Sequence, residues 1–393
     1  MSSIPKSINR ISSIDLVKGL AILIMALDHV RDYVHAPAFL FDPADPEQTT
    51  LAIFFTRWVT HYCAPAFSFL AGMSAYMVGK RKPQNELSGF LLKRGIWLVV
   101  IDVTIVSFAW FFDFQFGVIN LNVIASLGIS MIALAGLVYF PRKIVLIFSL
   151  ILIFGHNLLD DIRFDDSILW AIIHYQNIFF ISENSMLLVA YPIIPWIGVM
   201  SLGYCLGAYY EKSVDNYKRK QTFNLIGILA ILLFVILRWS NLYGEPNDFE
   251  QLGAFSKNLI SFLNPSKYPP SLLYLLMTLG VTFLVLANSE KWKGKAVDFI
   301  CTFGRVPFFF YIIHIYLIHV IAVGLAALTG FSWEKNMVLA AWGIIENPIP
   351  GYGFPLWVVY TVWVAVIFLL YPICKRFDRY KMGNKDKWWL SYF

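Results

Sequence analysis

Long apolar stretches alternate with polar connections along the whole chain. Each apolar stretch has about 20 residues, the length that a helix needs to cross a bilayer core of roughly 30 Å, whereas barrel strands would alternate over about 10 residues. The pattern therefore predicts an all-α polytopic membrane protein, a bundle of about ten transmembrane helices. We expect the spans at 12–35, 52–78, 91–112, 119–140, 143–159, 186–209, 222–239, 269–288, 303–328 and 354–374.

The composition agrees with an integral membrane protein. Of the 393 residues, 58% are hydrophobic and only 14% are charged, against roughly 25% charged residues in soluble domains. The first apolar stretch lacks a small-residue cleavage site, so we expect a retained helix rather than a signal peptide. We expect a single transmembrane domain over 1–393, in a multi-pass protein of the plasma (inner) membrane.

The net charge of +6 is explained by membrane topology rather than by nucleic-acid binding. Most Lys and Arg residues fall in alternate connections, and the long connections at about 160–185, 240–268 and 329–353 hold few of them. Basic residues gather on the cytoplasmic side, so both termini are predicted to be cytoplasmic. The long outer connections either cover a site or are simply solvated. The four cysteines lack metal-like spacing, so we expect no disulfide framework and no metal site.

The end of the first apolar stretch is rich in ionisable residues. Asp28, His29, Arg31 and Asp32 follow a run of apolar residues that begins near Ile14. The i, i+3, i+4 spacing places Asp28, Arg31 and Asp32 on one helix face. Because ionisable groups are costly in lipid at this depth, the spacing predicts that this face lines a cavity in the protein.

Histidines gather on three spans, from the middle of the membrane outward. His61 in the second span lies at a depth similar to that of His29, and Pro65 leaves the His61 carbonyl without its helical partner. The ninth span adds His314 and His319. Imidazole suits acid–base chemistry near neutral pH, although a single membrane histidine is more often a hydrogen-bonded packing residue. Three further residues receive no role: Asp102, His156 and His174.

Four segments carry a family resemblance, in order across nearly the whole chain: RISSIDLVKGLAILIMALDH, APAFSFLAGMSAY, YPIIPWIGVMSLGYCLGAYY and FGRVPFFFYIIHIYLIH. They resemble the transmembrane acyltransferase family of heparan-alpha-glucosaminide N-acetyltransferase and its bacterial relatives. The family usually has Arg where this chain has Lys18. Its eukaryotic enzymes have Asn and Asp in the places of His29 and His61, so the catalytic histidine stays open among His29, His35 and His61.

The resemblance implies transfer of an acetyl group from cytoplasmic acetyl-CoA, as co-substrate and without a metal. The acceptor would be an amine or hydroxyl of a sugar or glycan on the outer side of the lipid bilayer, and a homodimer is one assembly that the family allows. Lys18, Arg94 and Arg305 lie near cytoplasmic helix ends and suit the phosphates of CoA. The positive-inside rule alone also explains basic residues at these places.

The mechanistic hypothesis makes His29 the general base, oriented by Asp28 or Asp32, with His61 assisting or stabilising the oxyanion. Direct transfer and a ping-pong route through an acetyl-histidine both fit the sequence. The alternatives are a proton-coupled transporter of a small solute, which would use the same acids and imidazoles as a proton relay, and a non-catalytic scaffold. The histidines of the ninth span are expected to bind substrate: His314 and His319.

Overall fold

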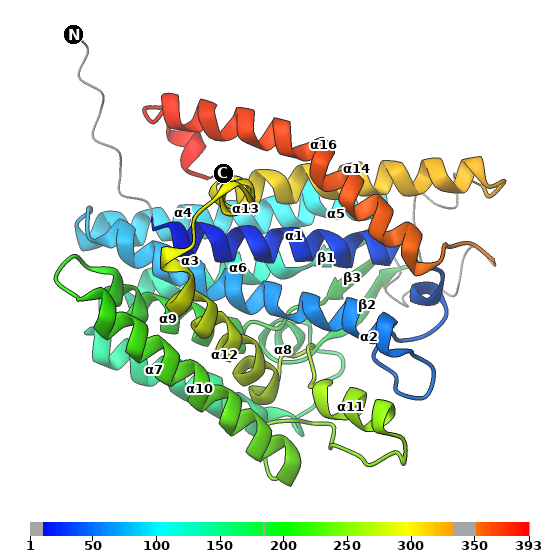
Figure 1. Cartoon of the computed structure of the whole chain (residues 1–393), viewed down its shortest axis with the longest axis horizontal. Coiled ribbons are helices and arrows are strands. Elements are labelled where there is room, and N and C mark those ends of the chain that lie inside the picture. Colours follow the sequence, from blue (N-terminus) through cyan, green and yellow to red (C-terminus); the bar gives the residue numbers. More distant parts are fainter. Residues whose placement is uncertain (1–10, 184, 333–350, 393) are drawn as a thin grey trace.

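The protein is a bundle of helices around a buried first helix, α1 (Figure 1). The computed structural model describes residues 11–183, 185–332 and 351–392. The longer helices are α1 Ser12–Val34, α3 Cys63–Gly79, α4 Gln84–Ile101, α6 Val123–Leu137, α7 Arg142–Gly155, α9 Ile194–Leu206, α10 Asn216–Ser240, α12 Leu272–Asn288, α13 Lys295–Arg305, α14 Pro307–Leu328 and α16 Leu356–Gly383. Shorter helices are α2 Leu51–Trp58, α5 Ser107–Phe111, α8 Ile168–Ile173 and α11 Phe255–Leu263.

The prediction of a mostly helical membrane protein is confirmed. Each of the ten expected ranges holds a helix, and five helical stretches in the described part of the chain are long and apolar enough to cross a membrane. These five are Arg142–Leu159, Asn216–Ser240, Leu272–Lys291, Pro307–Leu328 and Leu356–Gly383. The full count of ten stays a prediction. Residues 1–10 and most of the expected loop at 329–353 lie outside the described residues.

A small sheet corrects the expectation of an all-α fold. Strands β1 (Val118–Leu121), β2 (Asn177–Ser182) and β3 (Ser185–Val189) form the order β1-β3-β2, with β1 parallel and β2 antiparallel to β3. The sixth span was expected from 186, but its helix α9 begins only at Ile194. Pro192 and Pro195 explain the late start, since proline fits the first turn of a helix and interrupts its interior.

The third expected span is interrupted at an acidic residue. After α4 the chain makes a π-helical turn, η3 (Asp102–Val106), before α5. The buried Asp102 Oδ2 accepts the backbone N–H groups of Asn122 and Ala125, at 2.7 and 3.0 Å. These amides stand at the start of α6, where backbone donors lack helical partners. Asp102 therefore caps a neighbouring helix inside the bundle.

Glycines allow some helices to approach backbone to backbone. A Cβ on Gly72 of α3 would lie 1.9 Å from the Met200 carbonyl oxygen of α9, and one on Gly203 of α9 would lie 2.0 Å from the Phe69 carbonyl oxygen of α3. Small residues let helices in membrane proteins approach this closely. Helix α3, which lines the cavity described below, is thus held by direct contact with α9.

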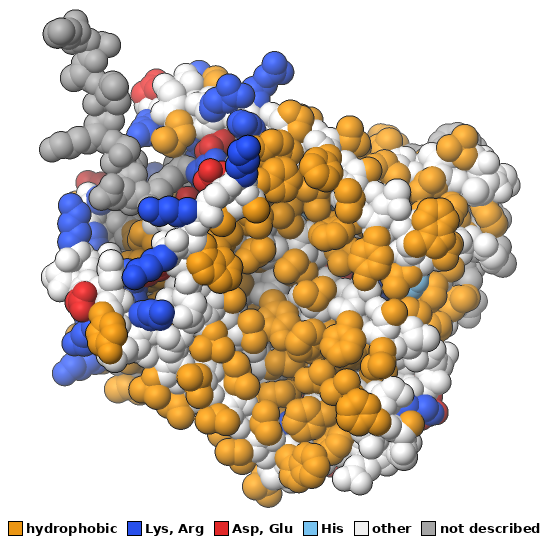
Figure 2. All heavy atoms as spheres, in the orientation of Figure 1, with side chains coloured by type: hydrophobic (Ala, Val, Ile, Leu, Met, Phe, Trp, Pro, Cys, Tyr) orange, Lys and Arg blue, Asp and Glu red, His pale blue; other side chains and the backbone are white. Residues whose placement is uncertain are grey.

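The surface divides into an apolar belt and a basic end. Helices α7, α10 and α16 expose large apolar side chains such as Ile147, Leu229 and Phe368. Figure 2 shows hydrophobic side chains over most of the visible face and Lys and Arg side chains gathered at its left end. Helix α1 begins and the chain ends at this side of the bundle (Figure 1). We call it the basic end, with its basic residues in 80–82, 212–220, 291–295 and 375–387.

Candidate functional site

A cavity of about 810 Å³ runs beside α1. The α1 residues that line it extend from Asp15 to Asp32, about 25 Å along the helix at 1.5 Å per residue. Every charged or imidazole side chain of α1 lines this cavity: Asp15, Lys18, Asp28, His29, Arg31 and Asp32. The prediction that the polar face of the first span looks into a cavity is therefore confirmed.

Helix α3 and the turn before it, η2 (Val59–Tyr62), supply the facing wall. The lining positions recur at helical spacing: Thr60, Cys63, Ala64, Phe67, Ala71, Ser74, Ala75 and Val78. Ser74 Oγ accepts a hydrogen bond from Lys18 Nζ at 2.9 Å. Towards the other end, Arg57 Nη1, just before η2, donates to Thr60 Oγ1 of η2 at 3.3 Å and to Asp28 Oδ2 of α1 at 2.7 Å. The two walls are thus connected near both ends of the cavity.

All three basic residues that were expected to bind CoA line the cavity towards the basic end: Lys18, Arg94 and Arg305. Their surroundings differ. Arg94 donates to the backbone carbonyls of Ser391, the last residue of the turn η7 (Trp388–Ser391), and of Tyr392, and these acceptors carry no formal charge. Arg305 Nε forms an ion pair with Asp378 Oδ2 at 2.7 Å. Arg305 therefore offers less net charge to a phosphate than Arg94 does.

Asp28 is the centre of a charge cluster in the half of the cavity away from the basic end. Its Oδ1 accepts from Arg31 Nη2 at 3.1 Å, and its Oδ2 accepts from Arg57 Nη1 at 2.7 Å. Lys267 Nζ lies 3.6 Å from the same Oδ2. Asp32 Oδ1 accepts from Arg31 Nη2 at 2.5 Å. Both carboxylates are thus held by cations, and neither has a hydrogen bond to His29 among the described contacts.

His29 pairs instead with a histidine of α14. His29 Nδ1 and His314 Nε2 lie 2.7 Å apart, and His314 Nδ1 lies 3.0 Å from the Phe310 carbonyl oxygen. A carbonyl only accepts, so His314 Nδ1 carries a proton, and in a neutral imidazole His314 Nε2 is then the acceptor. It follows that His29 Nδ1 is the donor. His29 lines the cavity and His314 does not, so the unprotonated Nε2 of His29 is left for the cavity.

The other predicted histidines lie behind the cavity wall. His61 is buried and does not line the cavity. Its carbonyl oxygen, which Pro65 leaves without a helical partner, accepts a hydrogen bond from Tyr274 Oη at 2.6 Å. His319 Nδ1 lies 2.8 Å from the Ala109 carbonyl oxygen, and its ring stacks on Phe112 at 3.8 Å. Both side chains therefore support the wall rather than face a ligand.

Three cavity residues were not assigned from the sequence: Arg57, Lys267 and Tyr268. Arg57 lies one helical turn before His61, and that spacing could have drawn attention to it. Lys267 and Tyr268 belong to a connection between helices, where no periodicity indicates which way a side chain points. Burial raises the pKa of Tyr268, but the positive charges of Lys267 and Arg57 outweigh it and the pKa lies below its ordinary value.

The chain matches the family model of heparan-alpha-glucosaminide N-acetyltransferase, catalytic, over residues 10–240. No curated protein matches the chain. The match covers more than half of the 393 residues and includes α1, η2 and α3, which form the cavity walls. The chain therefore belongs to this family and is an integral membrane acyltransferase. Helix α14, which supplies His314, lies beyond the matched residues.

Proposed function

We propose that this protein transfers an acetyl group from cytoplasmic acetyl-CoA to an amine or hydroxyl of a sugar on the other side of the membrane. The observation that carries the proposal is the cavity, whose lining joins Lys18 and Arg94 at the basic end to His29. Donor and acceptor can then reach His29 from opposite ends. We take the basic end as cytoplasmic by the positive-inside rule, with ten spans in one domain over 1–393, in the inner membrane.

The dimensions of the cavity suit the donor. Lys18 and His29 are separated by about 16 Å along α1 at 1.5 Å per residue. The pantetheine arm of CoA has about 13 bonds between its phosphate and its sulfur, and at about 1.27 Å per bond it also extends about 16 Å. A phosphate bound near Lys18 and Arg94 would thus bring the thioester to the level of His29.

The proposed chemistry uses the free nitrogen of His29. The acceptor nitrogen or oxygen attacks the thioester carbonyl carbon while His29 Nε2 takes its proton, and the carbon–sulfur bond breaks with release of the proton to the thiolate. His314 keeps accepting the Nδ1 proton, which stabilises the imidazolium that forms. Arg57 and Lys267 pair with Asp28, but together with Arg31 they are three cations against two carboxylates, so the cluster keeps positive charge for the oxyanion. We place His61 as a positioning residue of η2.

The test is turnover of radiolabelled acetyl-CoA by the full-length protein in nanodiscs, with and without glucosamine. We expect labelled N-acetylglucosamine from the wild type and a loss of about 10²- to 10⁴-fold in His29→Ala, the range that a general base contributes. Binding of acetyl-CoA to His29→Ala, followed by thermal shift, should persist and serves as the folding control. Acid-precipitated protein that keeps the label without acceptor would indicate the ping-pong route.

Two results would contradict acetyl transfer itself, and a third would contradict the role of His29. A wild type that neither binds nor consumes acetyl-CoA would exclude it as the donor. Proton-coupled flux of a solute into liposomes, with no requirement for acetyl-CoA, would instead favour the transporter. An unchanged turnover rate in His29→Ala would leave the donor in place but remove His29 as the base.

A further inference from the structure

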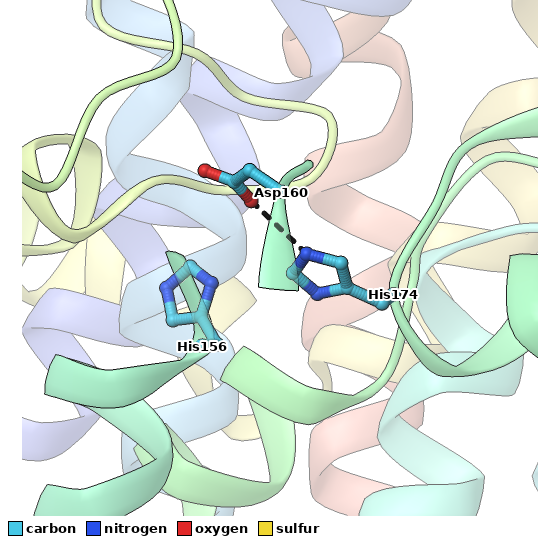
Figure 3. A group of neighbouring side chains, drawn as sticks. All are labelled: His156, Asp160 and His174. Atoms are coloured by element: carbon cyan, nitrogen blue, oxygen red, sulfur yellow. Dashed lines mark hydrogen bonds and ion pairs between the residues drawn. The ribbon is translucent and has the colours of Figure 1, made fainter. Parts of the chain in front are cut away.

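A second group of ionisable side chains lies apart from the cavity. His156 begins the turn η4 (His156–Leu159) at the end of α7, Asp160 follows this turn, and His174 follows α8. Figure 3 shows the three side chains close together, with Asp160 hydrogen-bonded to His174. The His174 Nε2 to Asp160 Oδ1 distance is 3.0 Å, and one ligand atom from each of the three residues lies within 4.8 Å of the others. None of the three lines the cavity.

The two imidazoles are buried without a full set of partners. His156 and His174 are each 2% exposed. Neither ring nitrogen of His156 has a hydrogen-bond partner in the described structure, and Nδ1 of His174 has none either. A buried polar group without a partner costs free energy, and such groups in native proteins call for an explanation. Each imidazole can offer one nitrogen to a shared ion, so the unpartnered His156 ring beside the Asp160–His174 pair indicates that something binds between the three side chains.

We propose that His156, Asp160 and His174 bind a divalent zinc ion. Two imidazoles and one carboxylate are a common zinc ligand set, with water in the fourth position. Ligand atoms in a tetrahedral zinc site lie about 3.3 Å apart, given zinc–ligand distances of about 2.0 Å. The three ligand atoms lie within 4.8 Å of one another, which is wider than a zinc site, so the side chains would move closer together when zinc binds. Asn157 already holds the carboxylate, since its Nδ2 donates to Asp160 Oδ2 at 2.7 Å.

The zinc ion would fix a connection that leads to the cavity. It would join the end of α7 to the end of α8, and the chain then continues directly to Gln176, which lines the cavity. Asn157 Oδ1 also accepts the backbone N–H of Leu272 at the start of α12. The site is therefore placed to stabilise the connections around the cavity end that lies away from the basic end. This role does not depend on the proposed acetyl transfer.

The experiment measures zinc in the tag-free full-length protein in nanodiscs. The protein is treated with a chelator, equilibrated with zinc sulfate and desalted, and the bound zinc is counted by mass spectrometry. We expect about one zinc ion per wild-type chain and a higher Tm with zinc than without it. His156→Gln should weaken zinc binding by more than about 100-fold, because even a residue behind a metal ligand contributes 10- to 100-fold.

Two variants make the result specific. Asp160→Asn keeps a side chain that can hydrogen-bond His174, so it should fold as the wild type does and still lose zinc. His35→Gln removes a buried imidazole outside the group and should keep zinc. A wild type without zinc after desalting, or a His156→Gln protein that holds as much zinc as the wild type, would overturn the proposal.

Discussion

His29 shows how one contact decides the chemistry of a side chain. Its neighbours in sequence, Asp28 and Asp32, are occupied by arginines, and its Nδ1 is fixed by His314. Because His314 is itself fixed by the Phe310 carbonyl, the direction of both hydrogen bonds is determined. The charged residues next to His29 therefore shape the cavity, while a residue from another helix sets the tautomer.

His314→Ala should lower kcat by about 10- to 100-fold, a part of what the general base contributes, because His29 loses the acceptor that orients it. The KM for acetyl-CoA should change little, since His314 does not line the cavity. His314→Gln offers an amide oxygen as acceptor and should recover part of kcat. A His314→Ala enzyme with the wild-type kcat would contradict the positioning role.

Glu245, in the connection after α10, gives a pH-dependent prediction for stability. Burial raises its pKa from 4.5 to about 7, against the hydrogen bond from Ser271 and the charge of Arg238. Between pH 4.5 and about 7 the folded protein keeps a proton that the unfolded chain has released, so this group lowers stability as pH rises. Above about pH 7 its unfavourable contribution is constant.

Glu245→Gln should remove this contribution. We expect the difference in Tm, variant minus wild type, to increase from pH 5 to pH 8. Differential scanning fluorimetry of both proteins in detergent measures this difference. Glu250→Gln, an exposed acid of the same connection, controls for the loss of one negative charge. Parallel wild-type and Glu245→Gln curves over this pH range would show that Glu245 does not titrate as described.

At the scale of elements, close helix pairs fix the cavity wall. Helix α3 carries the lining stripe, and its contact with α9 through Gly72 and Gly203 leaves no space for a side chain. A similar approach joins α1 to α13, where a Cβ on Gly304 would lie 1.8 Å from the Asp15 carbonyl oxygen. Both walls of the cavity are therefore positioned by backbone contacts with helices behind them.

Gly203→Ala should destabilise the protein by about 1–3 kcal/mol, the usual effect of an added group in a packed contact, because the new Cβ meets the Phe69 carbonyl at 2.0 Å. Gly324→Ala on α14 is the matched control, since its Cβ would meet nothing within 4 Å. Alanine favours helix over glycine, so the control should be as stable as the wild type or more so. The Tm of each protein in detergent measures the difference. Equal Tm values for the two variants would argue against the close packing of α3 and α9.

At the scale of the whole molecule, the cavity connects groups that no single element holds. Its lining comes from α1, α3 and α4, from the connection before α12 and from the chain end near α16. The apolar belt on α7, α10 and α16 surrounds these elements on the outside. The fold thus keeps charged groups away from lipid by turning them towards a shared interior.

Ala71→Phe should block the proposed route between Lys18 and His29, because Ala71 lines the cavity between Thr60 and Ser74. We expect acetyl transfer to fall by at least about 10-fold, since small displacements of the reacting groups already cost about 10²-fold. Ala327→Phe, an exposed position on α14, adds the same side chain outside the cavity and should leave turnover unchanged. Full activity in Ala71→Phe would indicate that the donor takes another path.

The sequence by itself determined the membrane class, the places of most helices and the polar face of α1, because hydrophobic periodicity and spacing along a helix are local properties. It also found Lys18, Arg94, Arg305 and His29, all of which line the cavity. Only the tertiary structure decided which groups meet. His29 and His314 form a pair although they are 285 residues apart in the sequence. Asp102 caps α6, and the rings of His156 and His174 lie close together although α8 separates them along the chain. Such pairings depend on how helices pack against one another, and a pattern read along one chain segment does not contain that information.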